Sequence, residues 1–180
     1  MSAVRPGRCP GCGAASRPEG GNLVVHGDGT RERQVWGPAA AHGPPTITTI
    51  RARRYECQRC GACVLVVPRE ILKRRLYAAP AIGLALALWA LLGLTQALVR
   101  VRVSPFAVVG AASANRWITL RRWARDASGH RLFAMRRASP ATFTLRQHAE
   151  RAAAMLQALA PAGLPVTESV FAGAAAHRPP

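Results

Sequence analysis

Residues 57–61 read Cys57-Gln58-Arg59-Cys60-Gly61 and repeat the pattern of Cys9-Pro10-Gly11-Cys12-Gly13. A Cys-x-x-Cys turn points both sulfur atoms at one place, and the glycine that follows lets the backbone fold back beneath them. Two such turns supply four thiolates, the ligand set of a closed structural Zn²⁺ site. The pair is far more specific than one turn, because a lone Cys-x-x-Cys also occurs as a redox motif. The pattern therefore predicts a zinc ribbon whose metal ligands are Cys9, Cys12, Cys57 and Cys60.

The segment between the two turns has the composition of β-strands. We expect strands at residues 22–26, 31–36, 46–55 and 63–67. The first two flank Gly27-Asp28-Gly29-Thr30, which indicates a β-hairpin with its turn at these four residues. A sheet this small cannot bury enough apolar surface to fold alone, so we expect the metal to contribute folding free energy.

The fifth cysteine, Cys63, makes the cysteine count odd. It begins an apolar run, so we expect a small buried side chain on a strand rather than a further metal ligand. No secretory signal precedes Cys9, and an odd number of thiols does not suit a disulfide-stapled secreted domain. These features favour a reducing cytoplasm.

The chain is strongly basic, with 25 Lys and Arg residues against 8 Asp and Glu residues and a formal net charge of +17. Such a balance favours a polyanionic partner, either nucleic acid or an anionic membrane surface. All but one of the basic residues are arginine, in a chain rich in Ala, Gly and Pro, which is the signature of a GC-rich genome. For this reason the placement of the arginines says more about function than their number.

An uncharged run from Leu76 to Val99 is long enough to span a bilayer. Its alanine content lowers its hydrophobicity, and basic residues flank it on both sides, so the positive-inside rule assigns no orientation. The run also divides into two helices, because Pro80 suits a first turn, Gly93 ends a helix, and Thr95 can cap a second helix over residues 96–103. We favour two buried helices, and a transmembrane span remains the alternative.

A third helix is expected over residues 114–125, with Ser113 as its N-cap. Its apolar stripe comprises Trp117, Leu120 and Ala124. With the preceding two helices it would form a helix-turn-helix unit, whose last helix enters the major groove of DNA. Asn and Arg side chains read base edges, and Thr and further Arg side chains hold phosphates. The candidate DNA-binding residues are Asn115, Arg116, Thr119, Arg121, Arg122 and Arg125.

The fold class expected from these features is α+β. The expected domains are a zinc ribbon at residues 1–68, a helix-turn-helix unit at residues 69–127, and a C-terminal helix with a flexible tail at residues 128–180. The C-terminal helix lies within residues 141–159 and either packs on the helical unit or forms a homodimer. Residues from 161 onward read as a mobile tail, apart from a short apolar patch at Val170-Phe171.

Taken together, the chain resembles the N-terminal zinc-ribbon and helix-turn-helix regions of bacterial insertion-sequence transposases. The residues that carry the resemblance are Cys9-Pro10-Gly11-Cys12-Gly13, Arg53-Arg54-Tyr55-Glu56-Cys57-Gln58-Arg59-Cys60-Gly61, Gly93-Leu94-Thr95-Gln96 and Thr119-Leu120-Arg121-Arg122-Trp123. The resemblance implies structural zinc and binding to double-stranded DNA.

The chain departs from such transposases in catalysis. Their nuclease domain resembles RNase H, in which three acidic residues hold two Mg²⁺ ions, and nothing after Asp126 reads like that domain. We therefore expect no enzymatic activity and predict a zinc-stabilised DNA-binding protein, transposase-derived or regulatory. Two alternatives stay open. The first is a single-span membrane protein with a cytosolic zinc ribbon and a span at about residues 76–99. The second is a zinc-ribbon adaptor that binds another protein.

Overall fold

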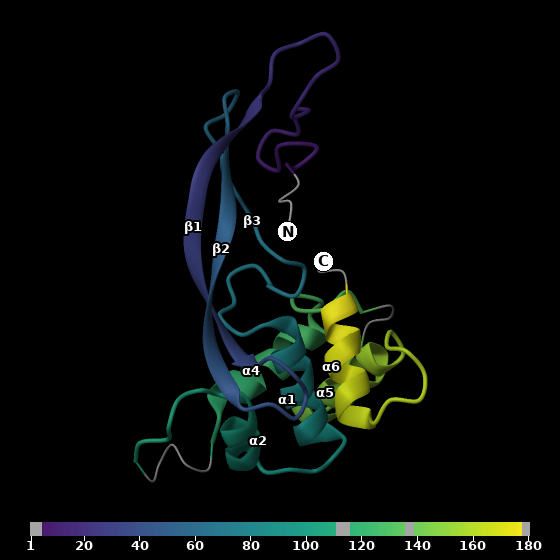
Figure 1. Cartoon of the computed structure of the whole chain (residues 1–180). Coiled ribbons are helices and arrows are strands. Elements are labelled where there is room, and N and C mark those ends of the chain that lie inside the picture. Colours follow the sequence, from purple (N-terminus) through teal and green to yellow (C-terminus); the bar gives the residue numbers. More distant parts are fainter. Residues whose placement is uncertain (1–4, 111–115, 136–138, 178–180) are drawn as a thin grey trace. The chain divides into compact units, whose positions relative to one another are not determined.

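The computed structural model describes residues 5–110, 116–135 and 139–177. These residues form an α+β protein with a three-stranded antiparallel sheet and five helices (Figure 1). The strands, in sheet order, are β1 (Val25–Pro38), β2 (Pro45–Cys57) and β3 (Cys63–Val66). The helices are α1 (Ala79–Ala90), α2 (Gln96–Val103), α4 (Ile118–Ser128), α5 (Leu145–Gln157) and α6 (Val166–Ala176).

The chain divides into two compact units. The ribbon unit comprises residues 1–34 and 49–68, and the helical unit comprises residues 35–48 and 69–180. The connection between β1 and β2 therefore groups with the helices, where Trp36 donates a backbone hydrogen bond to Leu76 and accepts one from Ala78. A further division of the helical unit near residue 127 stays a prediction.

The strands at residues 46–55 and 63–67 are confirmed, but the hairpin turn predicted at residues 27–30 is wrong. Strand β1 continues through these residues, with Gly29 at a φ of 77° and Asp28 paired to Arg54 at 2.8 Å. The chain reverses instead between Pro38 and Pro45. The glycines had suggested a turn, but pairing with the long strand β2 extends β1 past them, and Gly29 absorbs the irregular backbone.

The uncharged run forms two helices, as predicted. Pro80 lies in the first turn of α1, and Gly93 adopts a φ of 71° in the connection to α2. Thr95 caps α2 by accepting a hydrogen bond from the backbone N–H of Leu98. Among the residues that the structure describes, none of the helices has both the length and the apolar composition that crossing a bilayer requires.

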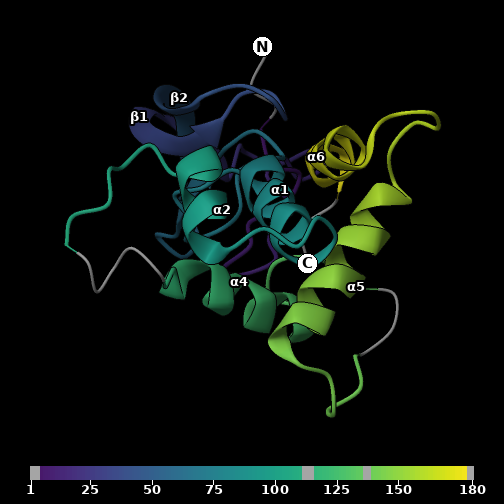
Figure 2. The same ribbon diagram turned by 90° about the horizontal axis from the view of Figure 1, so that it is seen from below.

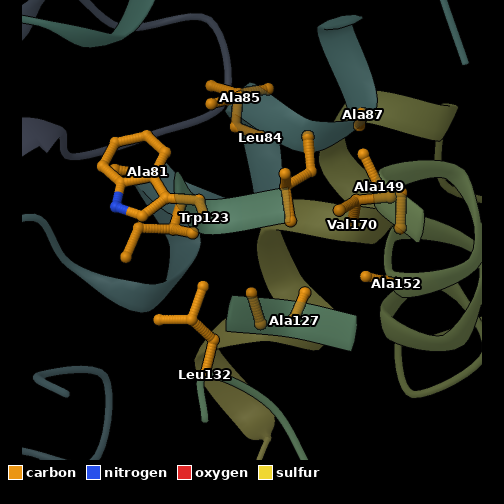
Figure 3. Packing of buried hydrophobic residues seen from close by; sticks show 14 of the residues in the cluster. Ala81, Leu84, Ala85, Ala87, Trp123, Ala127, Leu132, Ala149, Ala152 and Val170 are labelled. Carbon is orange, nitrogen blue, oxygen red and sulfur yellow. The ribbon is translucent and has the colours of Figure 1, made fainter. Parts of the chain in front are cut away.

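Helix α1 is the centre of the helical unit, because its residues from Ala79 to Leu88 are all buried (Figure 2). Figure 3 shows Trp123 and Ala127 of α4, Ala149 and Ala152 of α5 and Val170 of α6 in the same core. Alanine and glycine make up half of α1 and let the surrounding helices approach it closely. A Cβ atom at Gly83, for example, would lie 2.9 Å from the Cβ of Ala174 on α6.

The C-terminal segment contains two helices. Helix α5 begins with a capping box between Thr144 and Gln147, and its buried residues pack within the helical unit. The mobile tail predicted from residue 161 is wrong over α6, whose Val170 and Ala174 are buried. Small residues explain the error, because Gly173 lets α6 pack directly on the backbone of α5 although its sequence has little amphipathic character.

Candidate metal centre and nucleic-acid interface

The two cysteine turns fold alike. In the first, the backbone N–H of Gly13 donates to the carbonyl of Cys9 at 2.8 Å, and in the second Gly61 donates to Cys57 at the same distance. Gly13 and Gly61 have φ values of 72° and 70°. These left-handed conformations suit glycine and return the chain beneath the sulfur atoms, as the sequence predicted.

The four sulfur atoms of Cys9, Cys12, Cys57 and Cys60 lie within 4.8 Å of one another. The Sγ atoms of Cys9 and Cys60 are 3.7 Å apart, and those of Cys12 and Cys57 are 3.8 Å apart. A tetrahedral site with metal–sulfur bonds of 2.3 Å has sulfur–sulfur edges of about 3.8 Å. The four cysteines therefore fit a tetrahedral metal ion, and such a set of sulfur ligands suits zinc or iron.

Small residues and local hydrogen bonds complete this centre. The backbone N–H of Gly11 donates to the Sγ of Cys9 at 3.3 Å, as is common around thiolate ligands. A Cβ atom at Gly11 would lie only 3.0 Å from the side chain of Ala62 in the second turn, so glycine allows the two turns to meet. Cys9 and Cys57 also form a small core with Val25 and Tyr55.

The thiols perturb one another at these distances. The pKa of Cys9 is lowered to about 7, chiefly by the backbone N–H of Cys12. The backbone N–H of Gly11 lowers it further, whereas burial raises it. The backbone N–H of Ala62 likewise lowers the pKa of Cys60. The neighbouring thiols of Cys12, Cys9 and Cys57 together with desolvation outweigh it and raise the pKa of Cys60 to about 12. A second thiolate beside the first is thus unfavourable unless a cation is present.

Cys63 lies on β3 as predicted, but its side chain is exposed, so the expected burial is wrong. Its Sγ accepts a hydrogen bond from Nε of Arg54 at 2.8 Å. The four-cysteine cluster does not include Cys63. The apolar residues that follow Cys63 suggested burial, but on an edge strand alternate side chains point outward.

The candidate DNA-binding residues lie on or before α4, which begins at Ile118 rather than near residue 114. Arg121, Arg122 and Arg125 are exposed on α4, and Arg116 is exposed just before it. Thr119 is half-buried, and Asn115 lies outside the described residues, as does the expected N-cap Ser113. On the opposite side of α4, the buried residues are Leu120, Trp123, Ala124 and Ala127.

Aromatic side chains fix the position of α4 within the helical unit. Trp117 and Trp123 pack edge to face, with ring centroids 5.1 Å apart, and Trp123 packs in the same way on Tyr77 at 4.9 Å. The hydroxyl of Tyr77 donates to Oγ of Ser104 at 2.9 Å, and burial raises the pKa of Tyr77. The backbone N–H of Trp117 donates to the side-chain oxygen of Gln96, which ties the start of α4 to α2.

The carboxylate of Asp126 is occupied by two arginines outside α4. It lies 2.7 Å from Arg75 and 3.3 Å from Arg131. By contrast, within the described parts of the chain Arg121, Arg122 and Arg125 form no ion pair. These three residues and Ile118 occupy positions i, i+3, i+4 and i+7, and therefore share one side of α4. We call Ile118, Arg121, Arg122 and Arg125 the arginine face.

Sequence reasoning missed Ile118 because it selected only polar and charged side chains as DNA contacts. The side chain of Ile118 is 63% exposed and belongs to the arginine face rather than to the core. The sequence prediction assigned Ile118 neither to the apolar stripe nor to the DNA-binding residues. The predicted apolar stripe of Trp117, Leu120 and Ala124 is confirmed, because all three residues are buried.

Comparisons with protein-family models, with curated proteins and with solved structures found no match to this chain.

Proposed function

We propose that this protein binds double-stranded DNA through the arginine face of α4, is stabilised by one structural Zn²⁺ at the four cysteines, and has no enzymatic activity of its own. The proposal includes a transposase-derived or regulatory role in the cytoplasm. A reducing compartment suits four cysteines that must remain thiolates to bind metal. Zinc is favoured over iron because two Cys-x-x-Cys turns are the usual donor set of zinc ribbons.

The arginine face carries the proposal. An exposed helix that serves only for solubility usually alternates acidic and basic residues, which stabilise it as pairs at i and i+4. Here Arg121 and Arg125 form a like-charge pair at that spacing, which destabilises the helix by a few tenths of a kcal/mol. No Asp or Glu occurs anywhere between Glu70 and Asp126. A polyanionic ligand would neutralise this positive charge.

The geometry of α4 suits the major groove. Its core side is held by Trp117, Trp123 and Tyr77, so the arginines project from a rigid support. In Figure 2, α4 lies at the rim of the helical unit with α1 and α2 on one side. Helix α2 ends at Val103 and α4 begins at Ile118, farther apart in the sequence than the three- or four-residue turn of a standard helix-turn-helix, so the proposed unit is a variant of that motif.

A salt titration of DNA binding tests the proposal. The metal-replete full chain is titrated against a fluorescent duplex pool of random sequence, and the affinity is measured by anisotropy at several salt concentrations. Replacing Arg121, Arg122 and Arg125 together by Gln should reduce the slope of log K against log[salt] by about 3, because each phosphate contact contributes about 0.9. The matched control is Arg151→Gln on α5, which should leave the slope unchanged.

Three results would count against the proposed function. They are absence of binding, binding that does not depend on salt, and an equal loss in the triple variant and in Arg151→Gln. Circular dichroism of each variant checks that the helical unit is folded. The exposed positions of the three arginines make their removal neutral for the core.

A further inference from the structure

Ile118 is out of place in a charged surface. It is the first residue of α4, its side chain is 63% exposed, and its three partners on the same side of the helix are arginines. The core of the helical unit does not include it. An exposed isoleucine has a lower helix propensity than a straight-chain residue and exposes apolar surface to water. Val101 and Val109 are exposed more fully, at 65% and 87%, but Ile118 is the exposed apolar residue that shares one side of α4 with three arginines.

The position agrees with that of a base-reading residue. A recognition helix contacts base edges with its N-terminal residues, and phosphate contacts from basic side chains fix its register in the groove. In the major groove, thymine is the base that presents a methyl group, and apolar side chains recognise it by contact. The three arginines that follow Ile118 supply the positive charge that would hold phosphates on the same side of the helix.

We infer that Ile118 contacts the methyl group of thymine in the major groove and so gives the DNA-binding site a preference for thymine. This inference rests on the proposed DNA binding and names one base that the site reads. The contact with Ile118 excludes water from the methyl group and from the isoleucine side chain. It adds specificity to a face whose arginines otherwise provide affinity for any sequence.

The test compares two duplexes that differ only in that methyl group, an alternating A·T duplex and the same duplex with deoxyuridine in place of thymidine. The full metal-replete chain should bind the thymine duplex about fourfold more tightly, the factor that corresponds to burying one methyl group. Ile118→Ala should bind the two duplexes equally. Leu98→Ala is the matched control, since Leu98 is 54% exposed on α2 and lies outside the arginine face, and it should keep the preference.

The outcomes separate the inference from the proposed function. Equal binding of both duplexes by the unmodified chain, with normal salt dependence, overturns the role of Ile118 and leaves DNA binding intact. A preference that persists in Ile118→Ala, or that disappears in Leu98→Ala, also overturns it. Absence of binding to either duplex refutes both the function and the inference. Because Ile118 is exposed, its variant retains the core, and circular dichroism verifies this.

Discussion

Gly173→Ala tests how α6 is attached to the helical unit. A Cβ atom at residue 173 would lie 1.8 Å from the carbonyl oxygen of Leu156 on α5 and 2.7 Å from its carbonyl carbon. Contacts of this kind ordinarily lie at 3.4 Å or more. Because the obstructing atoms belong to the backbone, no side-chain rotation can relieve the contact. The two helices must move apart by about 1.5 Å for the methyl group to fit.

The expected cost follows from what that separation exposes. Val170 and Ala174 are buried on α6, and a gap of this size forfeits at least half of the dispersion energy of the atoms that line it. Overpacking costs about 1–3 kcal/mol and more where backbone is displaced, whereas replacing a helical Gly by Ala returns about 1 kcal/mol. Because backbone is displaced, we take the upper end of this range and expect a net destabilisation of about 2 kcal/mol, or a Tm lower by about 4–8 °C.

Urea denaturation followed by circular dichroism measures this effect. Gly83→Ala on α1 is the matched comparison, because its Cβ would lie 2.9 Å from the Cβ of Ala174, a much smaller overlap that a smaller helix displacement relieves. Gly83→Ala should therefore cost less than Gly173→Ala. A Gly173→Ala variant as stable as the unmodified chain would refute the close packing of α5 against α6.

Two further predictions concern the metal and the pH. Chelation should unfold the ribbon unit, which would lose about 10–16 kcal/mol of metal-binding free energy, whereas the helical signal persists. Trypsin should then cleave after Arg31, which is exposed but held in strand β1 in the folded protein. Resistance to trypsin after chelation would argue against structural metal. Burial lowers the pKa of His177. Near pH 6.5 the unfolded state therefore binds a proton that the folded state does not, so the helical unit should lose stability as the pH falls below about 6.5. In His177→Gln the side-chain oxygen can still accept the hydrogen bond from Ala134, and the dependence of stability on pH should become flatter. An unchanged pH dependence in this variant would contradict the role of His177.

The clustering of the four cysteines could be predicted because it depends on local chemistry. Each Cys-x-x-Cys-Gly segment contains its own turn, and two equal segments imply a shared centre, which the sulfur positions confirm. The division of the apolar run succeeded for the same reason, since Gly93 and Thr95 are local signals for the end of one helix and the start of the next.

The failures depend on contacts between residues distant in sequence. Gly29 and its neighbours read as a turn, but pairing between β1 and β2, including Asp28 with Arg54, keeps them in a strand. Helix α6 was not predicted because a small residue such as Gly173 contributes close packing rather than an apolar pattern in the sequence. No property of a single segment reveals that a distant backbone will fit against it.

The position of one acidic residue determines how the charge of the helical unit is distributed. Asp126 is the only acidic residue between Glu70 and Glu150, and it directly follows Arg125 in the sequence. It lies three residues after Trp123, on the side of α4 that turns toward the core, where it pairs with Arg75 and Arg131. The single carboxylate therefore supports the fold and leaves the arginine face unneutralised. Arg122 lies four residues before Asp126, the spacing of a helical ion pair, so it is the contacts with Arg75 and Arg131 that keep this carboxylate from neutralising the arginine face on which the proposed DNA binding rests.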